Sequence, residues 1–341
     1  MYEDADLADN SVFTTNFVPI FLFNLSDKLH VEAETEFSLN DLGETEVELE
    51  YANAHYFLTN TTTLTAGKFL LPFGQFSANF HPSWINRSPW TPGIYGPHDG
   101  NQAMEPLLPV LSDVGLALQQ VIPLCPDRKV FIDLYVSNGA REELEENGVD
   151  PDAPDETLDE ELHEELHSIE PEVEFEAASV DNNNNKAVGG RLAVAFLPPL
   201  EIGASYYKAK YDDEGDFEVI AKGLDLNWVG RHFIVRGEYI RKETEGLEEI
   251  EEDVFREHTF KRNGWYLQGT LQLGRIWPVL GGTEFLLERS VTSKLDKAHR
   301  WVYGFNYWLA PRTVIKLAYE DTDVKDGEDD NRVALQFSYA F

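Results

Sequence analysis

The sequence predicts an all-β protein, a transmembrane antiparallel β-barrel of about 16 strands, of which about 15 are visible in this chain. Three observations support this fold. The final segment is an amphipathic strand that ends on an aromatic residue, similar segments recur along the chain, and the connections between them alternate between tight turns and long polar loops.

Residues 331–341 alternate strictly between an apolar and a mixed face. The apolar face carries Val333, Leu335, Phe337, Tyr339 and Phe341. A closing strand with an aromatic carboxyl-terminus is typical of a bacterial outer-membrane barrel, which predicts the bacterial outer membrane as the location.

The composition agrees with strands rather than helices as the membrane-crossing elements. The chain has 42% hydrophobic residues and a net charge of -35, with a mean hydropathy of -0.36. Its uncharged stretch 10–26 contains Pro19 and is shorter than the roughly 20 apolar residues that a spanning helix needs. The single cysteine, Cys125, excludes an intrachain disulfide framework and a multi-cysteine metal cluster.

The alternating segments define fifteen expected strands, with boundaries uncertain by about 2–4 residues. They cover residues 12–25, 28–37, 45–58, 62–70, 113–122, 128–137, 186–197, 200–211, 217–229, 232–242, 263–275, 279–289, 299–309, 312–321 and 331–341.

The connections predict two unlike rims. Tight turns are expected at 26–27, 198–199, 230–231, 277–278 and 310–311, and long polar loops lie between them. Because bacterial barrels generally have an even number of strands, this parity predicts one more strand upstream of residue 1 and an outer loop over residues 1–11. Since the start also lacks the pattern of a secretory signal, we expect the amino-terminus to be incomplete.

Alternation assigns one face of each strand to lipid and the other to the lumen. The outward sets are apolar, whereas the inward sets are polar and small. The charged residues expected to line the pore are Glu32, Glu34, Glu36, Glu46, Glu48, Glu50, Asp133, Arg191, Asp225, Arg236, Glu238, Arg300 and Lys316.

The inward charges predict a net-negative lumen. Six of the acids fall on two neighbouring strands, 28–37 and 45–58, so they would face one wall. Such a field concentrates cations in a narrow pore and favours passive diffusion of small hydrophilic solutes with a preference for cations. Alternatively, the acids pair with the inward bases or are screened at a wide mouth.

Residues 71–112 are too apolar for a solvated loop, and we expect them to fold inward and narrow the channel. The constriction would contain Trp84, Arg87, Trp90, His98, Asp99 and Glu105. The competing interpretations are that this loop latches onto a neighbouring subunit, covers the barrel, or docks a protein partner.

Residues 66–74 (AGKFLLPFG), 85–88 (INRS) and 113–118 (DVGLAL) resemble the porin O and P family. The resemblance implies a sixteen-strand barrel, a pore and a homotrimer. Phosphate-selective members of that family use dense lumen arrays of arginine and lysine, whereas the inward face here is rich in acids. An anion- or phosphate-selective porin therefore stays an alternative, as does a barrel that acts as a sheath or receptor for a partner protein or surface ligand.

Residues 138–185 form a predicted acidic outer loop with a short helix at 157–169, and residues 142–176 contain 17 acids and no lysine or arginine. His163, Glu164 and His167 have the spacing of a zinc-protease motif. A loop of this size cannot supply the surrounding domain, the third ligand and the cleft, so we interpret the match as accidental. No other catalytic motif is present, and we do not expect an enzyme.

Further acidic clusters at 212–216, 248–253 and 326–330 could bind Ca²⁺ or Mg²⁺ in the outer loops, and no cofactor is otherwise expected. The expected surroundings are outer-membrane lipid and lipopolysaccharide. Nucleic acid is disfavoured because the negative charge would repel a polyanion.

Overall fold

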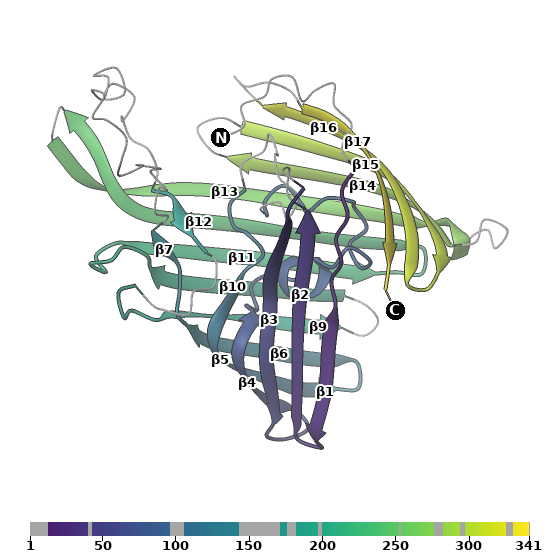
Figure 1. Cartoon of the computed structure of the whole chain (residues 1–341), viewed down its shortest axis with the longest axis horizontal. Coiled ribbons are helices and arrows are strands. Elements are labelled where there is room, and N and C mark those ends of the chain that lie inside the picture. Colours follow the sequence, from purple (N-terminus) through teal and green to yellow (C-terminus); the bar gives the residue numbers. More distant parts are fainter. Residues whose placement is uncertain are drawn as a thin grey trace.

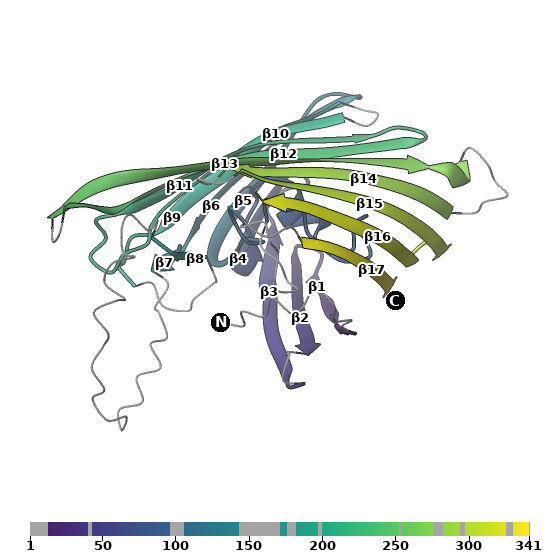
Figure 2. The same ribbon diagram turned by 90° about the horizontal axis from the view of Figure 1, so that it is seen from above.

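Fifteen antiparallel strands follow one another in chain order through a single curved sheet (Figures 1 and 2). The computed structural model describes residues 13–39, 43–95, 106–142, 171–175, 182–196, 200–251, 254–275, 282–293, 297–324 and 330–340. The strands are β1 (Ile20–Ser26), β2 (Leu29–Leu39), β3 (Thr45–Phe57), β4 (Thr62–Leu70), β5 (Ser112–Cys125), β6 (Arg128–Ser137), β9 (Ala187–Phe196), β10 (Leu200–Lys210), β11 (Glu218–Val229), β12 (Phe233–Glu251), β13 (Val254–Gln272), β14 (Gly282–Ser293), β15 (Lys297–Ala310), β16 (Thr313–Val324) and β17 (Asp330–Tyr339).

The remaining elements are small. A π-helix, η2 (Phe76–Phe80), follows β4, and a 3-10 turn, η4 (Leu273–Arg275), follows β13. The two-residue strands β7 (Arg141–Glu142) and β8 (Val173–Glu174) pair with each other, and Arg141 holds Glu174 through two hydrogen bonds of 2.6 and 2.7 Å. No helix among the described residues has the length and hydropathy needed to cross a membrane.

The predicted all-β fold is confirmed, and each expected strand corresponds to one strand of the sheet. The short connections 27–28, 126–127, 230–232 and 311–312 lie at one rim, and the long segments that follow β4 and β6 lie at the other. The expected upstream strand stays a prediction. Residues 1–11, the expected helix 157–169 and Phe341 lie outside the described residues.

Two predicted boundaries are wrong. The first strand begins at Ile20 rather than at residue 12, because Pro19 has no N–H to give to the ladder, and only an isolated bridge joins Phe17 to Phe37 before it. The segment 243–262, expected to be a loop, continues β12 and β13 as a projecting hairpin (Figure 1). In it Glu243 lies opposite Lys261, and opposite charges at facing positions stabilise a polar hairpin.

Pairing of the described strands begins at β1 and ends at β17, each of which has one neighbour in the sheet. Figure 2 shows the sheet curving round, with β1 and β17 as its two ends. Residues 71–95, which follow β4, lie on the concave side, since they contact strands from both halves of the sheet.

The two faces of the sheet differ as alternation predicts. On β17, Val333, Leu335 and Phe337 are 71%, 76% and 64% exposed. On β16, by contrast, the inward Lys316 and Glu320 are each 1% exposed, beside the outward Leu317. A water-soluble sheet buries its apolar face and exposes its polar face. Here the apolar face is exposed and the polar face is covered, which matches a sheet that faces lipid.

The outer face therefore predicts a position-dependent effect of charge. Replacing Leu317, an exposed outward residue of β16, by arginine should lower the free energy of unfolding in lipid vesicles by about 2–4 kcal/mol, the cost of an arginine near the bilayer midplane. The control is Leu247→Arg on the projecting part of β12, which should cost less than about 1 kcal/mol. Equal costs for the two variants, measured by equilibrium urea unfolding, would contradict the assignment of the outer face.

Candidate functional site

The interior of the sheet is the candidate site, and the segment 71–95 determines its shape. This segment packs against the concave face with apolar side chains, among them Phe73, Phe76, Ile94 and Tyr95, which are at most 2% exposed. Two wall glycines make room for it. A Cβ on Gly223 would come within 3.1 Å of the Phe73 ring, and one on Gly264 would come within 3.0 Å of Ile94.

The carboxylate of Glu238 on β12 is the main polar contact of the segment 71–95. It accepts hydrogen bonds from the Phe76 N–H at 2.7 Å, the Tyr95 hydroxyl at 2.6 Å and the Tyr266 hydroxyl at 3.0 Å. Burial, and then the charge of Glu238, raise the pKa of Tyr95 well above its ordinary value, so its hydroxyl stays protonated and donates.

Gly74 allows this approach. Its φ is +65°, and a Cβ there would come within 2.0 Å of a Glu238 carboxylate oxygen. A residue with a side chain would meet both the strain of a left-handed backbone and this clash. Glycine at position 74 therefore lets the backbone of the turn approach the carboxylate of Glu238.

A second network joins the segment 71–95 to β9, β10 and β11. Arg191 donates to Asp225 from Nε at 2.9 Å and from Nη2 at 2.6 Å, and also donates to Glu201 at 2.8 Å. The amide of Gln75 donates to Asp225 at 2.9 Å. Gly203 lies between Arg191 and Asp225, where a Cβ would come within 2.4 Å of the Asp225 carboxylate.

Basic side chains of the opposite wall hold the backbone of residues 83–91. Lys316 donates to the carbonyl oxygens of Ser83 and Ser88 at 2.5 and 3.0 Å. Arg300 donates to the carbonyl oxygen of Thr91 and, at 3.2 Å, to the carboxylate of Glu288. These two bases are each 1% exposed, so the segment covers them.

Other wall bases are similarly engaged. The guanidinium of Arg236 lies over the Phe80 ring at 3.8 Å. Arg332 donates to Glu320 at 2.6 Å and lies over the Trp90 ring at 5.5 Å. The segment 71–95 and neighbouring side chains thus contact both of these bases.

The expected constriction residues have different surroundings. Trp84 lines an open cavity. Arg87 lies between Glu284, at 3.5 Å, and the Trp308 ring, at 4.7 Å. Trp90 is 9% exposed and packs against the wall residues Leu286, Val302 and Ala318, so it anchors the segment. His98, Asp99 and Glu105 lie outside the described residues.

The acidic wall of β2 and β3 contains an irregularity that alternation does not show. Glu34 pairs with Tyr51, but the next residue, Thr35, pairs with Leu49, so Glu50 is an extra residue in β3. Glu46 and Glu48 are exposed, whereas Glu50 and Glu34 are each 4% exposed. After this bulge the sequence of inward positions shifts by one, and Tyr51, Asn53 and His55 line the interior.

Histidines support Glu32 on this wall. One carboxylate oxygen lies 2.9 Å from Nε2 of His55, whose Nδ1 contacts the Thr65 hydroxyl at 2.8 Å, and the other lies 3.7 Å from Nε2 of His30. Glu36 accepts a hydrogen bond from the Asn16 amide at 2.6 Å. Within the described part of the chain, no group of three or more histidines, cysteines or acids is arranged to hold a metal ion.

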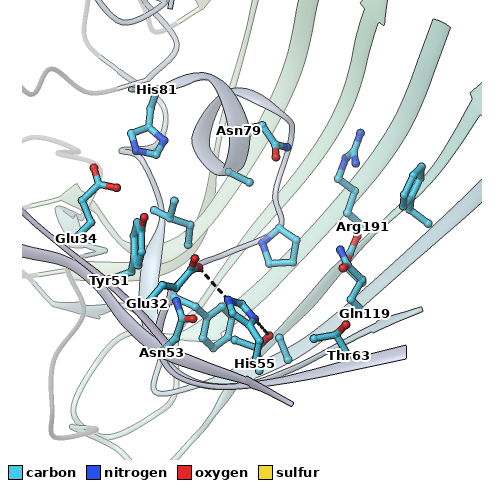
Figure 3. A pocket seen from close by; sticks show the side chains of 18 of the residues that line it. Glu32, Glu34, Tyr51, Asn53, His55, Thr63, Asn79, His81, Gln119 and Arg191 are labelled. Carbon is cyan, nitrogen blue, oxygen red and sulfur yellow. Dashed lines mark hydrogen bonds and ion pairs between the residues drawn. The ribbon is translucent and has the colours of Figure 1, made fainter. Parts of the chain in front are cut away.

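A cavity of about 590 Å³ lies between the acidic wall and the segment 71–95 (Figure 3). Four carboxylates line it, those of Glu32, Glu34, Asp133 and Glu201, the last of which pairs with Arg191. Three of these acids, Glu32, Glu34 and Asp133, belong to the pore-lining set that the sequence predicts, and Glu201 does not. Sequence reasoning also missed Tyr51, Asn53 and His55, because nothing in the sequence marks the bulge at Glu50. It also missed Gln75 and Tyr95, whose contacts depend on how the loop folds back.

The acidic loop cluster 212–216 is organised by hydrogen bonds. Asp212 accepts from the N–H groups of Asp216 and Phe217 at 2.8 and 2.7 Å. Its carboxylate thus caps a turn, and loop binding of Ca²⁺ or Mg²⁺ stays a prediction.

No protein-family model and no curated protein sequence matches this chain. Several solved structures are similar to it. An anion-selective porin from Comamonas acidovorans has a TM-score of 0.54 at 14% identity, covering 96% of this chain and 85% of that one. A loop-deletion mutant of OmpT, an outer membrane protein of Vibrio cholerae, has a TM-score of 0.53 at 11% identity over 96% of both chains.

The outer membrane channel DcaP of Acinetobacter baumannii has a TM-score of 0.53 at 11% identity, covering 96% of this chain and 85% of that one. At these identities the likeness establishes the fold. The chain has a porin-like β-barrel fold, as the sequence predicts.

The contact between Tyr95 and Glu238 can be tested by removing one hydroxyl. Tyr95→Phe should lower the free energy of unfolding in detergent by about 1–3 kcal/mol, because it leaves a buried carboxylate oxygen without that donor. Tyr307→Phe is the matched control on the exposed outer face of β15, and it should change the free energy by less than about 0.5 kcal/mol. Indistinguishable unfolding curves for the two variants would argue against this anchor.

Proposed function

We propose that the chain is an outer-membrane porin that passes small hydrophilic solutes and ions by passive diffusion, with a preference for cations. The observation that carries the proposal is the separation of charge inside the sheet. The described wall bases Lys316, Arg300 and Arg332 bind loop carbonyl oxygens or carboxylates, whereas the open cavity is lined by four carboxylates and, among the described residues, one arginine that pairs with carboxylates.

This separation decides which charge a solute would meet. Lys316 donates to two carbonyl oxygens of the loop and does not line the cavity, so a solute in the cavity does not contact it. Carboxylates that border the path act directly on ions within it, and low-dielectric walls strengthen that field. The acids Glu46 and Glu48, exposed on the same wall as the cavity, extend the negative surface.

The solved anion-selective porin has the same fold, so the fold itself does not set selectivity. The interior side chains decide it, and the charged side chains that line the open cavity of this chain are four carboxylates and one arginine. We also propose, from the resemblance of residues 66–74, 85–88 and 113–118, that the chain forms a homotrimer in contact with outer-membrane lipid and lipopolysaccharide. We propose no enzymatic activity.

The reversal potential of the purified protein in a planar bilayer under a KCl gradient tests the preference. A potential on the cation side is expected. The double variant Glu32→Gln/Glu34→Gln should lower the cation-to-anion permeability ratio by a factor of about two or more, because two charges leave the path. Glu257→Gln, on the exposed projecting part of β13, removes one charge away from the path and should leave the ratio unchanged.

Two results would contradict the proposal. A reversal potential on the anion side would favour the alternative of an anion- or phosphate-selective porin. Absence of any conductance from correctly folded protein would favour a sheath or receptor whose lumen is occupied by a partner.

A further inference from the structure

We propose that the cavity beside β2 and β3 contains a binding subsite for an organic cation, a small molecule that joins an ammonium or guanidinium group to an apolar or aromatic body. The inference rests on the proposed function, since it names the class of solute for which the pore has a specific site. The hydrogen-bond acceptors, the charge balance and the aromatic surfaces of the cavity support this assignment.

The cavity has the size of a small-molecule site. Its volume of about 590 Å³ falls within the range of about 300–1,000 Å³ that is usual for such sites. Strands β2 to β6 form one side, and the segment around Asn79, His81 and Trp84 forms the other (Figure 3). Residues from distant parts of the chain thus converge on one space.

The wall offers acceptors to a cation. Glu32 and Glu34 lie on the same face of β2, and both line the cavity. Asn53 is 6% exposed and hydrogen-bonds to Glu32, an interaction in which the amide nitrogen must donate because an ionised carboxylate can only accept. Within the described residues, its Oδ1 is buried and has no hydrogen-bond partner.

An unsatisfied buried carbonyl oxygen is costly, and a donor from a bound solute would satisfy it. An ammonium group has three donors and no acceptor. It could contact Oδ1 of Asn53 and the carboxylates beside it in the same site. An ionised carboxylate, which has acceptors only, could make none of these contacts.

The balance of charges also excludes an anion as the favoured ligand. Among the described residues that line the cavity, Arg191 is the only arginine or lysine, and it donates to Asp225 and Glu201. Its Nη2 lies 2.6 Å from a carboxylate oxygen of Asp225 and 2.8 Å from one of Glu201. An anion would therefore have to compete with two carboxylates for the one permanent cation.

Aromatic side chains favour an organic cation over a metal ion. Tyr51, Phe131 and Trp84 line the same cavity as the acids, and Figure 3 shows Tyr51 beside Glu32 and Glu34. Aromatic faces attract cations and also bury apolar groups. A simple alkali ion would use the carboxylates only, whereas an aromatic amine would use both kinds of surface.

The test is binding of phenethylamine to the folded, detergent-solubilised full chain, measured by isothermal titration calorimetry at low salt. The pH is mildly alkaline, where imidazole is ordinarily neutral and the amine is charged. Phenylacetate and 2-phenylethanol are the matched anionic and neutral probes. Phenethylamine should bind at least about tenfold more tightly than either, the factor expected from one charge-assisted hydrogen bond.

Variants locate the site. Glu34→Gln should weaken phenethylamine binding by about tenfold or more, and Glu257→Gln should leave it unchanged. Because Glu34 is buried, Trp84→Ala provides a second variant that removes an aromatic surface of the loop without altering charge, and it should weaken the amine more than it weakens binding of K⁺. Circular dichroism verifies that each variant is folded.

Equal affinity for the amine and for phenylacetate, or no binding of phenethylamine by folded protein, would overturn the inference. The same experiments distinguish a failure of this inference from a failure of the proposed porin function. A protein that conducts ions in a bilayer without binding the amine remains a porin without the subsite, whereas one that binds the amine without conducting has the site but is not a porin.

Discussion

The fold of this chain depends on one constraint, that the polar inner face of a curved sheet must be satisfied by water or by the chain itself. The segment 71–95 satisfies much of it. Its backbone supplies N–H donors to Glu238 and carbonyl acceptors to Lys316 and Arg300, which are on opposite parts of the sheet. Without these contacts, several buried ionised groups would lack partners, at a cost that a membrane protein cannot offset by hydrophobic burial on its inner side.

This constraint also sorts the charges. The bases beneath the segment are matched to carbonyl oxygens and carboxylates, and four carboxylates together with aromatic side chains border the open cavity. The proposed preference for cations would thus follow from how the loop is anchored. A loop that folded to the other side of the lumen would cover the acids and expose the bases, and the same fold would then prefer anions.

Much of the fold could be predicted from the sequence because alternation with a period of two is a local property. The fifteen strands, the apolar outer face and the inward position of Lys316 and Glu238 all follow from it. The bulge at Glu50 could not be predicted from alternation, because one inserted residue leaves no mark in the composition. This bulge nevertheless places Tyr51, Asn53 and His55 in the cavity. The hairpin of β12 and β13 was also missed, because a run of acids resembles a loop until the bases facing it are known.

The inward fold of the loop was expected from its apolar residues, but which residues would anchor it was not. Trp90 and Trp84 have similar sequence surroundings, and one is buried against β14 to β16 while the other lines the cavity. That difference depends on contacts between residues far apart in the chain. Glycines such as Gly74 and Gly264 permit those contacts, and a sequence alone does not say what a glycine approaches.

The central claim is that residues 71–95 are anchored to strands on opposite parts of the sheet and leave an open path beside β2 and β3. The hydroxyl oxygens of Ser83 on the loop and Ser338 on β17 lie 2.9 Å apart, so the most direct measurement is a double variant, Ser83→Cys/Ser338→Cys, on a Cys125→Ser background. The account predicts that an intrachain disulfide forms on mild oxidation and that bilayer conductance and reversal potential are the same before and after reduction. A disulfide that does not form, or one that closes the channel, would contradict the account.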